Sequence, residues 1–346
     1  MSRTRCPPTP MFSLHPIARQ LLQMRWTLLS AAWLPIAATA NPSGGVVVGG
    51  NTHAIITTPD ATTTTINQSR QTAIINWDQF SVGGGEQVIF NQPSVSAAIL
   101  NRVIGGTSSE ILGTISGNGR VFLVNPQGVL IGSTGQINVQ GLVVSTLGIT
   151  DADFNRGTYR FSAAFEAPST VNNEGNIQIG GGGFVVLVGD TVINAGQIAV
   201  PASVDDASGV ATQTGEVLLA SGSRLALMLD AEGLVSYDIT AAASSDLGGV
   251  STLEGSIINA PAGDVYLSGF ANGSLIRAAV NNEGYVSAET IQDNNGVIVL
   301  EGRAGDVISS GSLNAYGDSG TGGSVNVLSD STVNIVGRID ASGSFG

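Results

Sequence analysis

A repeated unit, in which a glycine leads into a short apolar strand, restricts this chain to few folds. Copies of the unit begin at Gly119, Gly215, Gly263, Gly296 and Gly323. The last three copies are separated by 33 and then 27 residues. One such unit is too short to bury its own apolar side chains, so successive units must stack on one another. The repeat therefore predicts an all-β solenoid.

A second repeated unit supplies the turns of this solenoid. An aliphatic residue followed by asparagine precedes several short strands, and the letters VNNEG occur twice, at 171–175 and 280–284. Asparagine at a turn can bond its own backbone, and we expect it to stack on an asparagine of the next coil. Two or three short strands per repeat are typical of a parallel β-helix, whose coils stack about 4.8 Å apart.

The regularity of this pattern is interrupted at a few places. The segments 204–214 and 241–250 are irregular, so we expect them to form loops or hairpins that leave the coil. Helical periodicity is absent except at 94–100 and 151–156, each long enough for a single helical turn.

Composition agrees with a slim, stacked interior. The 346 residues include 47 glycines and only 5% aromatic residues, but 42% hydrophobic residues, which argues against disorder. Beyond residue 40 there are nine arginines, no lysine and 26 acidic residues, a formal charge of −17. So acidic a chain argues against binding to nucleic acid or anionic lipid.

Residues 1–40 have the pattern of a secretory signal peptide. A basic region ends at Arg25, an apolar segment follows, and small residues precede a predicted cleavage between Ala40 and Asn41. Translation could also start at Met11 or Met24. No later apolar segment approaches the roughly 20 residues that span a membrane, so stable membrane insertion is not expected. The mature chain is expected to begin at Asn41.

The stretch from Gly117 to Gly132 reads GNGRVFLVNPQGVLIG and predicts strand, tight turn, strand. The turn is the tetrapeptide Asn125, Pro126, Gln127 and Gly128. Proline presets φ for a turn, asparagine can bond its own backbone, and glycine tolerates any φ. We interpret the stretch as one coil of the solenoid.

Several motifs, taken in order, resemble the secretion domain of two-partner-secretion exoproteins of the filamentous-haemagglutinin type. The similarity is greatest to the high-molecular-weight adhesin branch and covers 41–300. The motifs are NWDQFSVG at 76–83, FNQPS at 90–94, ILNRV at 99–103, ILG at 111–113, the stretch at 117–132, STL at 145–147 and DADF at 151–154. The resemblance implies a right-handed parallel β-helix with an N-terminal cap and extra-helical hairpins. Residues 301–346 would continue the β-helix repeats.

The resemblance also implies a partner and a site. The partner is an outer-membrane β-barrel transporter whose periplasmic domains recognise the secretion domain. The family's Asn-Pro-x-Gly motif maps onto Asn125–Gly128, where Gln127 replaces the commoner Asn. A weaker second motif falls on Asn91, Gln92, Pro93 and Ser94. Two roles remain open for Asn125–Gly128, namely shaping one coil or contacting the transporter directly.

Four arginines in the matched region also allow two interpretations. They either face an acidic partner surface or form ion pairs with nearby acids, each worth roughly 0–1 kcal/mol. They are Arg102, Arg120, Arg156 and Arg160.

The residues do not favour an enzyme. After the leader the chain has one histidine, His53, and neither cysteine nor lysine, which removes most pairs of nucleophile and base. Asp151 and Asp153 are expected to cap a helical turn, and Asp205–Asp206 to lie in a solvated loop. The glycine runs lack the residues of a phosphate-binding loop. The sequence predicts no catalytic residue, cofactor or metal ion.

These observations predict the N-terminal secretion domain of a large bacterial exoprotein, secreted or displayed at the cell surface after Sec export through the periplasm. The strand-turn pattern continues to the last residues, so we expect the repeat to extend beyond residue 346. The whole protein is expected to act in adhesion, with host-cell or other bacterial surface receptors as further partners. The alternatives are a carrier of a contact-dependent toxin and a β-helical carbohydrate-active enzyme.

Overall fold

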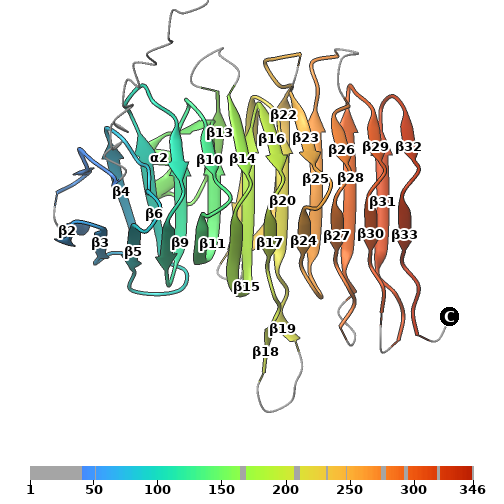
Figure 1. Cartoon of the computed structure of the whole chain (residues 1–346), viewed down its shortest axis with the longest axis horizontal. Coiled ribbons are helices and arrows are strands. Elements are labelled where there is room, and N and C mark those ends of the chain that lie inside the picture. Colours follow the sequence, from blue (N-terminus) through green and yellow to red (C-terminus); the bar gives the residue numbers. More distant parts are fainter. Residues whose placement is uncertain are drawn as a thin grey trace, which may run out of the picture. The chain divides into compact units, whose positions relative to one another are not determined.

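The chain forms a parallel β-helix with an N-terminal cap and extra-helical hairpins (Figure 1). The computed structural model describes residues 41–50, 52–163, 169–205, 211–230, 233–246, 248–273, 278–291, 295–317 and 320–344. The leader expected at 1–40 lies outside these residues. The β-helix is right-handed, as the family resemblance implies.

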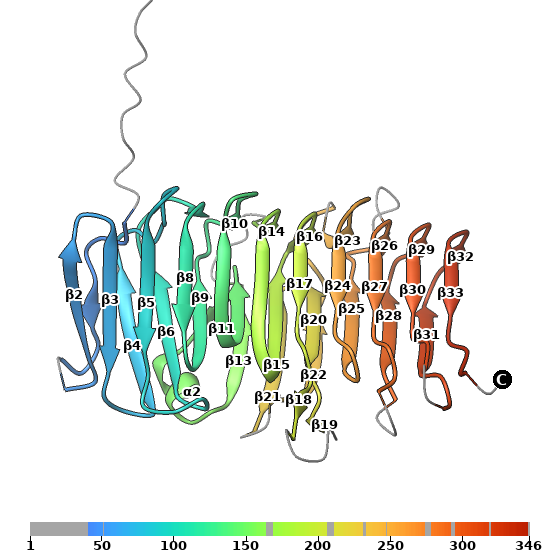
Figure 2. The same ribbon diagram turned by 60° about the horizontal axis from the view of Figure 1, so that its bottom comes forward.

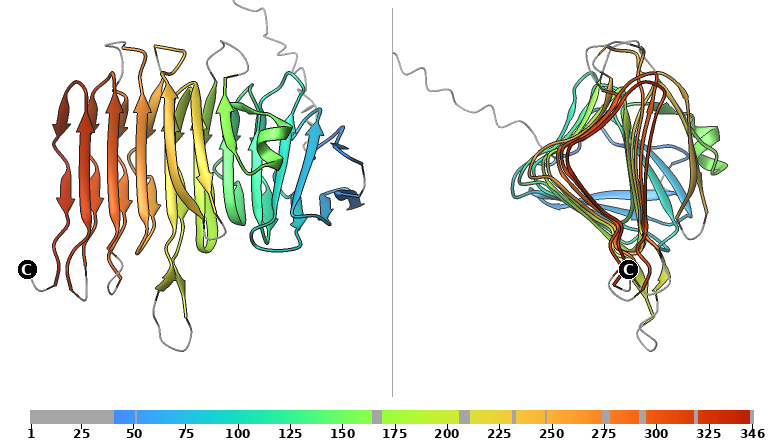
Figure 3. Two further views of the ribbon diagram at one scale, coloured as in Figure 1. Left: turned by 180° about the vertical axis from the view of Figure 1, so that it is seen from behind. Right: turned by 90° about the vertical axis from the view of Figure 1, so that its right-hand side faces the viewer.

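Each coil passes over three faces, which are best seen along the helix axis (Figure 3). The first face contains β3 (Thr63–Gln68), β5 (Gln87–Asn91), β8 (Thr114–Gly117), β17 (Gln197–Ala199), β24 (Ile257–Asn259), β27 (Tyr285–Ser287), β30 (Ser312–Asn314) and β33 (Arg338–Asp340). The second face contains β4 (Thr72–Trp77), β6 (Ala98–Val103), β9 (Arg120–Val124), β20 (Glu216–Ser221), β25 (Asp264–Phe270), β28 (Val297–Arg303) and β31 (Ser324–Ser329). The third face contains β7 (Ser109–Ile111), β10 (Val129–Ile131), β14 (Thr170–Asn173), β16 (Thr191–Asn194), β23 (Gly249–Thr252), β26 (Val280–Asn282), β29 (Val307–Ser309) and β32 (Val333–Ile335).

Two long strands turn from the first face into the second. They are β11 (Gln136–Ser145) and β15 (Asn176–Gly189). At the N-terminal end, β1 (Val46–Val47) pairs antiparallel with β4, and β2 (Ala54–Asp60) pairs antiparallel with β3. These antiparallel strands form the cap.

Two excursions leave the coil (Figure 2). The larger is a four-stranded antiparallel sheet of β12 (Gly148–Ile149), β13 (Tyr159–Ser162), β21 (Arg224–Leu229) and β22 (Leu234–Ala241), with the short helix α2 (Asp151–Asn155) between β12 and β13. We call it the extra-helical sheet. The smaller is the hairpin of β18 (Ser203–Val204) and β19 (Ala211–Gln213).

The positions expected from the sequence for these excursions agree only in part with the structure. The hairpin β18–β19 begins at Ser203, one residue before the expected 204–214 segment, and α2 lies within the expected helical turn at 151–156. The other hairpin precedes the expected 241–250, because β21–β22 already ends at Ala241. The helical turn expected at 94–100 is wrong, since β6 begins at Ala98 and its apolar side chains are buried in the sheet.

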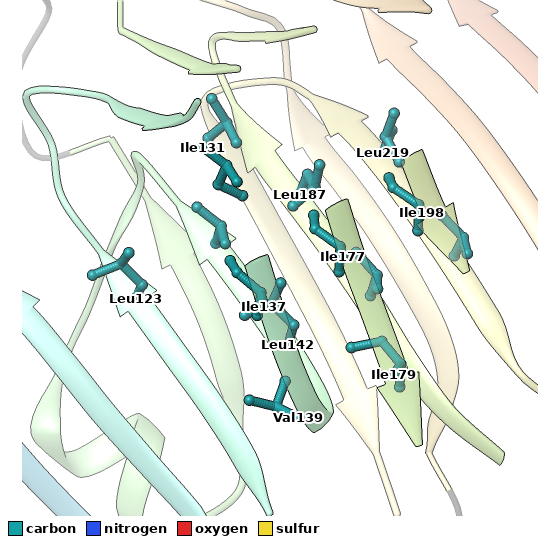
Figure 4. Close-up of a cluster of buried hydrophobic side chains, with 14 of the residues drawn as sticks. Leu123, Ile131, Ile137, Val139, Leu142, Ile177, Ile179, Leu187, Ile198 and Leu219 are labelled. Carbon is teal, nitrogen blue, oxygen red and sulfur yellow. The ribbon is translucent and has the colours of Figure 1, made fainter. Parts of the chain in front are cut away.

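Inward aliphatic side chains stack in register from coil to coil. On the first face one ladder consists of Ile137, Ile177, Ile198, Ile258, Val286 and Leu313. Every member is at most 1% exposed, and Figure 4 shows the first three side by side. Burying one such side chain stabilises the fold by roughly 1.5–3 kcal/mol. The register of the parallel strands is therefore set by this interior.

A polar ladder runs inside the third face. It consists of Asn173, Asn194, Thr252, Asn282 and Ser309, all 0% exposed and in register. Asn173 Nδ2 donates to Asn194 Oδ1 at 2.7 Å, and Asn282 Nδ2 donates to Ser309 Oγ at 3.0 Å. The Thr252 hydroxyl donates to Asn282 Oδ1. The stacking of turn asparagines expected from the sequence is thus found, with Thr and Ser continuing the row.

The outward side of the second face is buried beneath the extra-helical sheet. The covered row consists of Ile74, Leu100, Phe122, Val143, Val186 and Leu218, each at most 2% exposed. Phe122 packs against α2 and β13, with ring centroids 5.2 Å from Phe154 and 5.1 Å from Tyr159. The same row reaches the exposed Asn326 on β31, beyond the sheet. The molecule therefore has a second core outside the coil.

Asn282→Ala is expected to destabilise the fold by about 1–3 kcal/mol. The change leaves the buried Thr252 and Ser309 hydroxyls without their amide partner, and such groups cost about that much. Urea unfolding followed by circular dichroism measures the difference. The matched control is Asn281→Ala on the same strand, whose amide bonds Glu283 at the surface; a change within about 0.5 kcal/mol is expected there. Equal losses in both variants would contradict a role for the ladder.

Candidate functional site

The tetrapeptide Asn125–Gly128 forms the corner between β9 on the second face and β10 on the third. We call it the β9–β10 corner. The Gln127 N–H donates to Asn125 Oδ1 at 2.9 Å, and the Gly128 N–H donates to Asn125 O at 3.1 Å. Gly128 has φ +111, a backbone conformation that residues with a Cβ atom rarely adopt. The local turn predicted from Asn, Pro and Gly is therefore formed.

Asn125 connects three successive coils. Its Nδ2 donates to Thr107 O at 3.0 Å and to Ser109 Oγ at 2.9 Å, in the preceding coil. Its backbone N–H donates to Ser145 O at 2.9 Å, at the end of β11 in the following coil. The Asn125 side chain is 0% exposed. The buried side-chain amide of Asn125 thus bonds its own turn and the preceding coil, and the backbone N–H of Asn125 bonds the following coil.

The exposed part of the β9–β10 corner is small. Gln127 is exposed and Pro126 is half-buried, whereas Asn125 and Gly128 are buried. In the folded molecule a partner can therefore reach the Gln127 side chain and part of the proline ring, but not the asparagine. Gln127, which stands where the family more commonly has Asn, is therefore the exposed residue of the turn.

The second motif is built in the same way at the opposite end of the second face. Gln92, 8% exposed, follows β5 and precedes β6. Its Nε2 donates to Gln68 Oε1 of the preceding coil at 3.1 Å and to Ala97 O of its own coil at 2.9 Å. It also lies 3.3 Å from Arg120 O of the following coil. A Cβ on Gly119 would lie 2.7 Å from the Gln92 carboxamide carbon, so that glycine makes room for it.

The remaining residues of the second motif lie at the surface. Asn91 is exposed and donates to Asn67 Oδ1 at 2.9 Å, and Ser94 Oγ donates to Gln71 Oε1 at 2.9 Å. Pro93 is exposed. The structure therefore does not bring the two motifs together into one pocket. It places each at a corner that brackets the strands of the second face.

Three arginines of the coil fasten the extra-helical sheet. Arg102 Nη2 donates to Ile149 O on β12 at 2.8 Å and pairs with Asp151 at 2.7 Å. Arg303 Nη1 donates to Ile239 O on β22 at 2.9 Å. Arginine holds the carbonyl at each edge with a charge-assisted hydrogen bond, which is stronger than a neutral one. Both edge strands of the sheet are therefore tied to the coil.

Arg120 holds the tip of the β21–β22 hairpin. The side chain is 7% exposed, its Nη2 donates to Asp230 O at 2.6 Å, and its Cζ lies 5.5 Å from the centre of the Phe184 ring. Arg102 thus forms an ion pair with an acid, as one of the two interpretations proposed. The contacts of Arg120 are instead with a main-chain carbonyl and an aromatic ring. Arg156 and Arg160 are exposed, and neither forms an ion pair within the described part of the chain.

A half-buried carboxyl group, that of Glu216, lies under the same hairpin tip. Glu216 Oε2 accepts the Leu234 N–H at 2.8 Å. Burial raises the pKa of Glu216 to about 7, and nearby Asp264 and Asp230 add to the rise. Asp264 is its in-register neighbour on β25, and burial also raises the pKa of that carboxyl. This pair is not evident from the sequence, because the two acids are 48 residues apart and meet only through strand register.

Of the two aspartates expected to cap a helical turn, Asp153 takes part in the N-terminal cap of α2. Thr150 is the N-cap of α2 and accepts the Asp153 N–H at 3.0 Å, and Asp153 Oδ2 accepts the Thr150 hydroxyl at 2.9 Å. Asp206 lies outside the described residues. Across the described ranges, no group of three or more His, Cys, Asp or Glu side chains is arranged to hold a metal ion. In that same part of the chain no helix is long and apolar enough to span a membrane.

Comparison with known proteins identifies the architecture. A family model described as the TPS secretion domain matches residues 38–315. A heme/hemopexin-binding protein of Haemophilus influenzae strain Rd is 31% identical over 243 residues, which are 68% of this chain and 25% of that protein. A second heme/hemopexin-binding protein of Haemophilus influenzae is 32% identical over 252 residues, 68% of this chain and 26% of its own length. The match thus spans about a quarter of the length of these relatives.

Two solved structures share the fold. The HMW1 secretion domain from Haemophilus influenzae has a TM-score of 0.70 and 28% identity, covering 88% of this chain and 74% of that one. The filamentous hemagglutinin secretion domain has a TM-score of 0.53 and 12% identity, covering 87% of this chain and 96% of that one. The second likeness is one of fold alone.

Glu216→Gln is expected to stabilise the protein at pH 8 and to leave its stability unchanged at pH 4. The folded state raises the pKa of Glu216 from 4.5 to about 7. The contribution of the protonated carboxyl is therefore complete below pH 4.5 and is lost as the pH rises through 7. The difference between the two pKa values corresponds to a gain in the free energy of unfolding of at most about 3 kcal/mol for Glu216→Gln at pH 8. Denaturant unfolding at both pH values measures it.

The control for this substitution is Glu254→Gln, at an exposed carboxylate. It should leave the dependence of stability on pH unaltered. An equal gain for Glu216→Gln at pH 4 and pH 8 would show that ionisation of the Glu216 carboxyl is not the cause.

Proposed function

Because the chain belongs to the TPS secretion domain family, we propose that it directs the export of a larger exoprotein through a dedicated outer-membrane transporter. The match to the family over residues 38–315 is the observation that carries this proposal. The likeness to the HMW1 secretion domain supports it. In this proposal 41–300 is the secretion domain, and 301–346 continues the β-helix as the first coils of the exported part.

The partner we propose is an outer-membrane β-barrel transporter whose periplasmic domains recognise this chain. Residues 1–40 would first direct Sec export and be removed between Ala40 and Asn41. The exported protein would then be secreted or remain at the cell surface. Folding of each coil onto the previous one would disfavour return through the transporter, because every added coil buries a further set of inward aliphatic side chains.

Within this function we assign the β9–β10 corner to coil formation. Asn125 is fully buried and its amide is occupied by bonds to Thr107, Ser109 and Gln127. A transporter that binds the folded corner reaches only Gln127 and Pro126. Contact with Asn125 itself would have to precede folding. We propose the same coil-forming role for Gln92, which bonds its neighbouring coils in the same way.

The activity of the whole protein is a separate proposal. We propose adhesion to host-cell or other bacterial surface receptors, following the resemblance to adhesin secretion domains. A second candidate is binding of heme or hemopexin, which the names of two relatives state for those proteins. A toxin carrier and a carbohydrate-active enzyme are alternatives that no described residue favours. We propose that the chain itself needs no cofactor and is not catalytic.

Asn125→Ala is expected to lower both stability and export. Loss of the side chain removes three hydrogen bonds inside the coil, and the unsatisfied buried groups cost about 1–3 kcal/mol. Secretion is measured as the exported fraction in cells that co-express a two-partner-secretion transporter of the proposed kind. Stability is measured by urea unfolding of the purified chain.

Gln127→Ala serves as the matched control in the same turn, because its side chain is exposed. It should retain both stability and export. Loss of export in Asn125→Ala with unchanged stability would favour direct contact over coil formation. Normal export of the chain in cells without any transporter would overturn the proposed function itself.

A further inference from the structure

The outward face of the extra-helical sheet contains a hollow of about 500 Å³. Two parts of this sheet form the hollow together, namely β12–α2–β13 and the hairpin β21–β22. These parts are more than 60 residues apart in the sequence. The side chains that matter below are Arg160, Arg224, Thr150, Ser162, Thr240 and Asp153. We call this feature the arginine hollow. Its volume falls within the range of small-molecule sites.

The two arginines lie on the same face of adjacent strands. Arg160 is opposite Ala226, and Ser162 is opposite Arg224, so Arg160 and Arg224 are diagonal neighbours. Such neighbours are roughly 7–8 Å apart, within reach of long side chains. Both arginines are exposed. Two like charges therefore lie on the same face of the sheet and line the same hollow.

Neither guanidinium has an acidic partner among the described residues, although the chain beyond residue 40 carries a charge of −17. One carboxylate, that of Asp153, lines the hollow, and it accepts the Thr150 hydroxyl. Asp238 is on the same strand as Thr240 but lies 3.9 Å from Arg303. The hollow thus has two cationic groups against one anionic group, which is the reverse of the whole chain.

The edges of the sheet limit which ligand fits. An extended peptide adds to a sheet through the free main-chain groups of an edge strand. Here Arg102 binds the Ile149 carbonyl on β12, and Arg303 binds the Ile239 carbonyl on β22. One main-chain carbonyl at each edge is thus already bonded, and the hollow itself is lined by side chains of the outward face. Those side chains are two guanidinium groups and the hydroxyls of Thr150, Ser162 and Thr240.

We propose that the arginine hollow binds an acidic polysaccharide through its carboxylate or sulfate groups. Guanidinium groups bind planar and tetrahedral oxyanions with paired, charge-assisted hydrogen bonds. The three hydroxyls supply donors and acceptors for the sugar hydroxyls. The site lies on the folded extra-helical sheet, so the proposal concerns the protein after export and does not depend on recognition by a transporter.

The test measures binding of fluorescein-labelled hexasaccharides to the exported full-length protein by fluorescence polarisation. One arm uses a heparin-derived hexasaccharide, which carries sulfate, and one uses a polygalacturonate hexasaccharide, which carries only carboxylates. Binding of either is expected at low ionic strength and should weaken with added salt. Maltohexaose, of the same length but neutral, should not bind. No binding in either acidic arm, or equal binding of maltohexaose, would overturn the proposal.

Arg160→Gln and Arg224→Gln should each weaken binding about tenfold, because each removes a charge-assisted contact. Ala226→Glu provides an independent variant that keeps both arginines. It places a carboxylate opposite Arg160 and should abolish binding. Arg156→Gln removes an exposed arginine outside the hollow and should change affinity less than about twofold. Equal losses in Arg156→Gln would show that affinity follows net charge and would overturn the site.

A fluorescein-labelled hexaglutamate peptide separates this proposal from an acidic protein ligand. Weaker binding of the peptide than of either acidic hexasaccharide is expected, since the peptide cannot use the hydroxyls as sugar partners. Tighter binding of the peptide, lost in Arg160→Gln, would overturn the saccharide assignment. The thermal unfolding midpoints of Arg160→Gln and Arg224→Gln should remain that of the wild type, because both arginines are exposed.

Discussion

In-register stacking of parallel strands is the constraint on which the rest of this structure depends. Each inward side chain lies above its equivalent in the previous coil, as Ile177 lies on Ile137 and Ile198 on Ile177. A slip of one residue would turn the inward row to the outside. The coil therefore needs fixed corners, and buried amides at Gln92, Asn125 and the ladder of the third face provide them. Strand stacking supplies the burial energy and sets the register, and the corner amides bond each coil to the next in that register.

The second face shows how one solenoid sequence acquires two cores. Strands β9, β15 and β20 are covered by the coil interior on one side and by the extra-helical sheet on the other. Their apolar residues therefore run almost continuously, as in the RVFLV of β9. Beyond the sheet the same face alternates, as in the SVNVLS of β31. Continuous apolar runs thus marked the covered strands, although the sequence analysis treated them as ordinary coils.

Arginine has two distinct uses in an otherwise acidic molecule. Arg102, Arg120 and Arg303 extend from the coil to main-chain carbonyls of the extra-helical sheet and hold it in place. Arg160 and Arg224 belong to the sheet itself and extend outward. Sequence alone gives no means to separate these groups, because the fastening bonds join residues 47 to 110 positions apart. The separation follows from which side of the sheet each arginine occupies.

The amino-acid sequence by itself determined the all-β solenoid, its family, the turn at Asn125–Gly128 and the stacking of turn asparagines. The solenoid, the turn and the stacking are local or periodic, so propensity and spacing carry them, whereas the family follows from the resemblance of several motifs in order. The folded chain alone decided that Asn125 and Gln92 each bond neighbouring coils, that β21–β22 covers β20, and that Glu216 meets Asp264. Those contacts depend on the length of each coil and on where each excursion folds back. No short-range pattern encodes either quantity, and for that reason three-dimensional packing had to supply them.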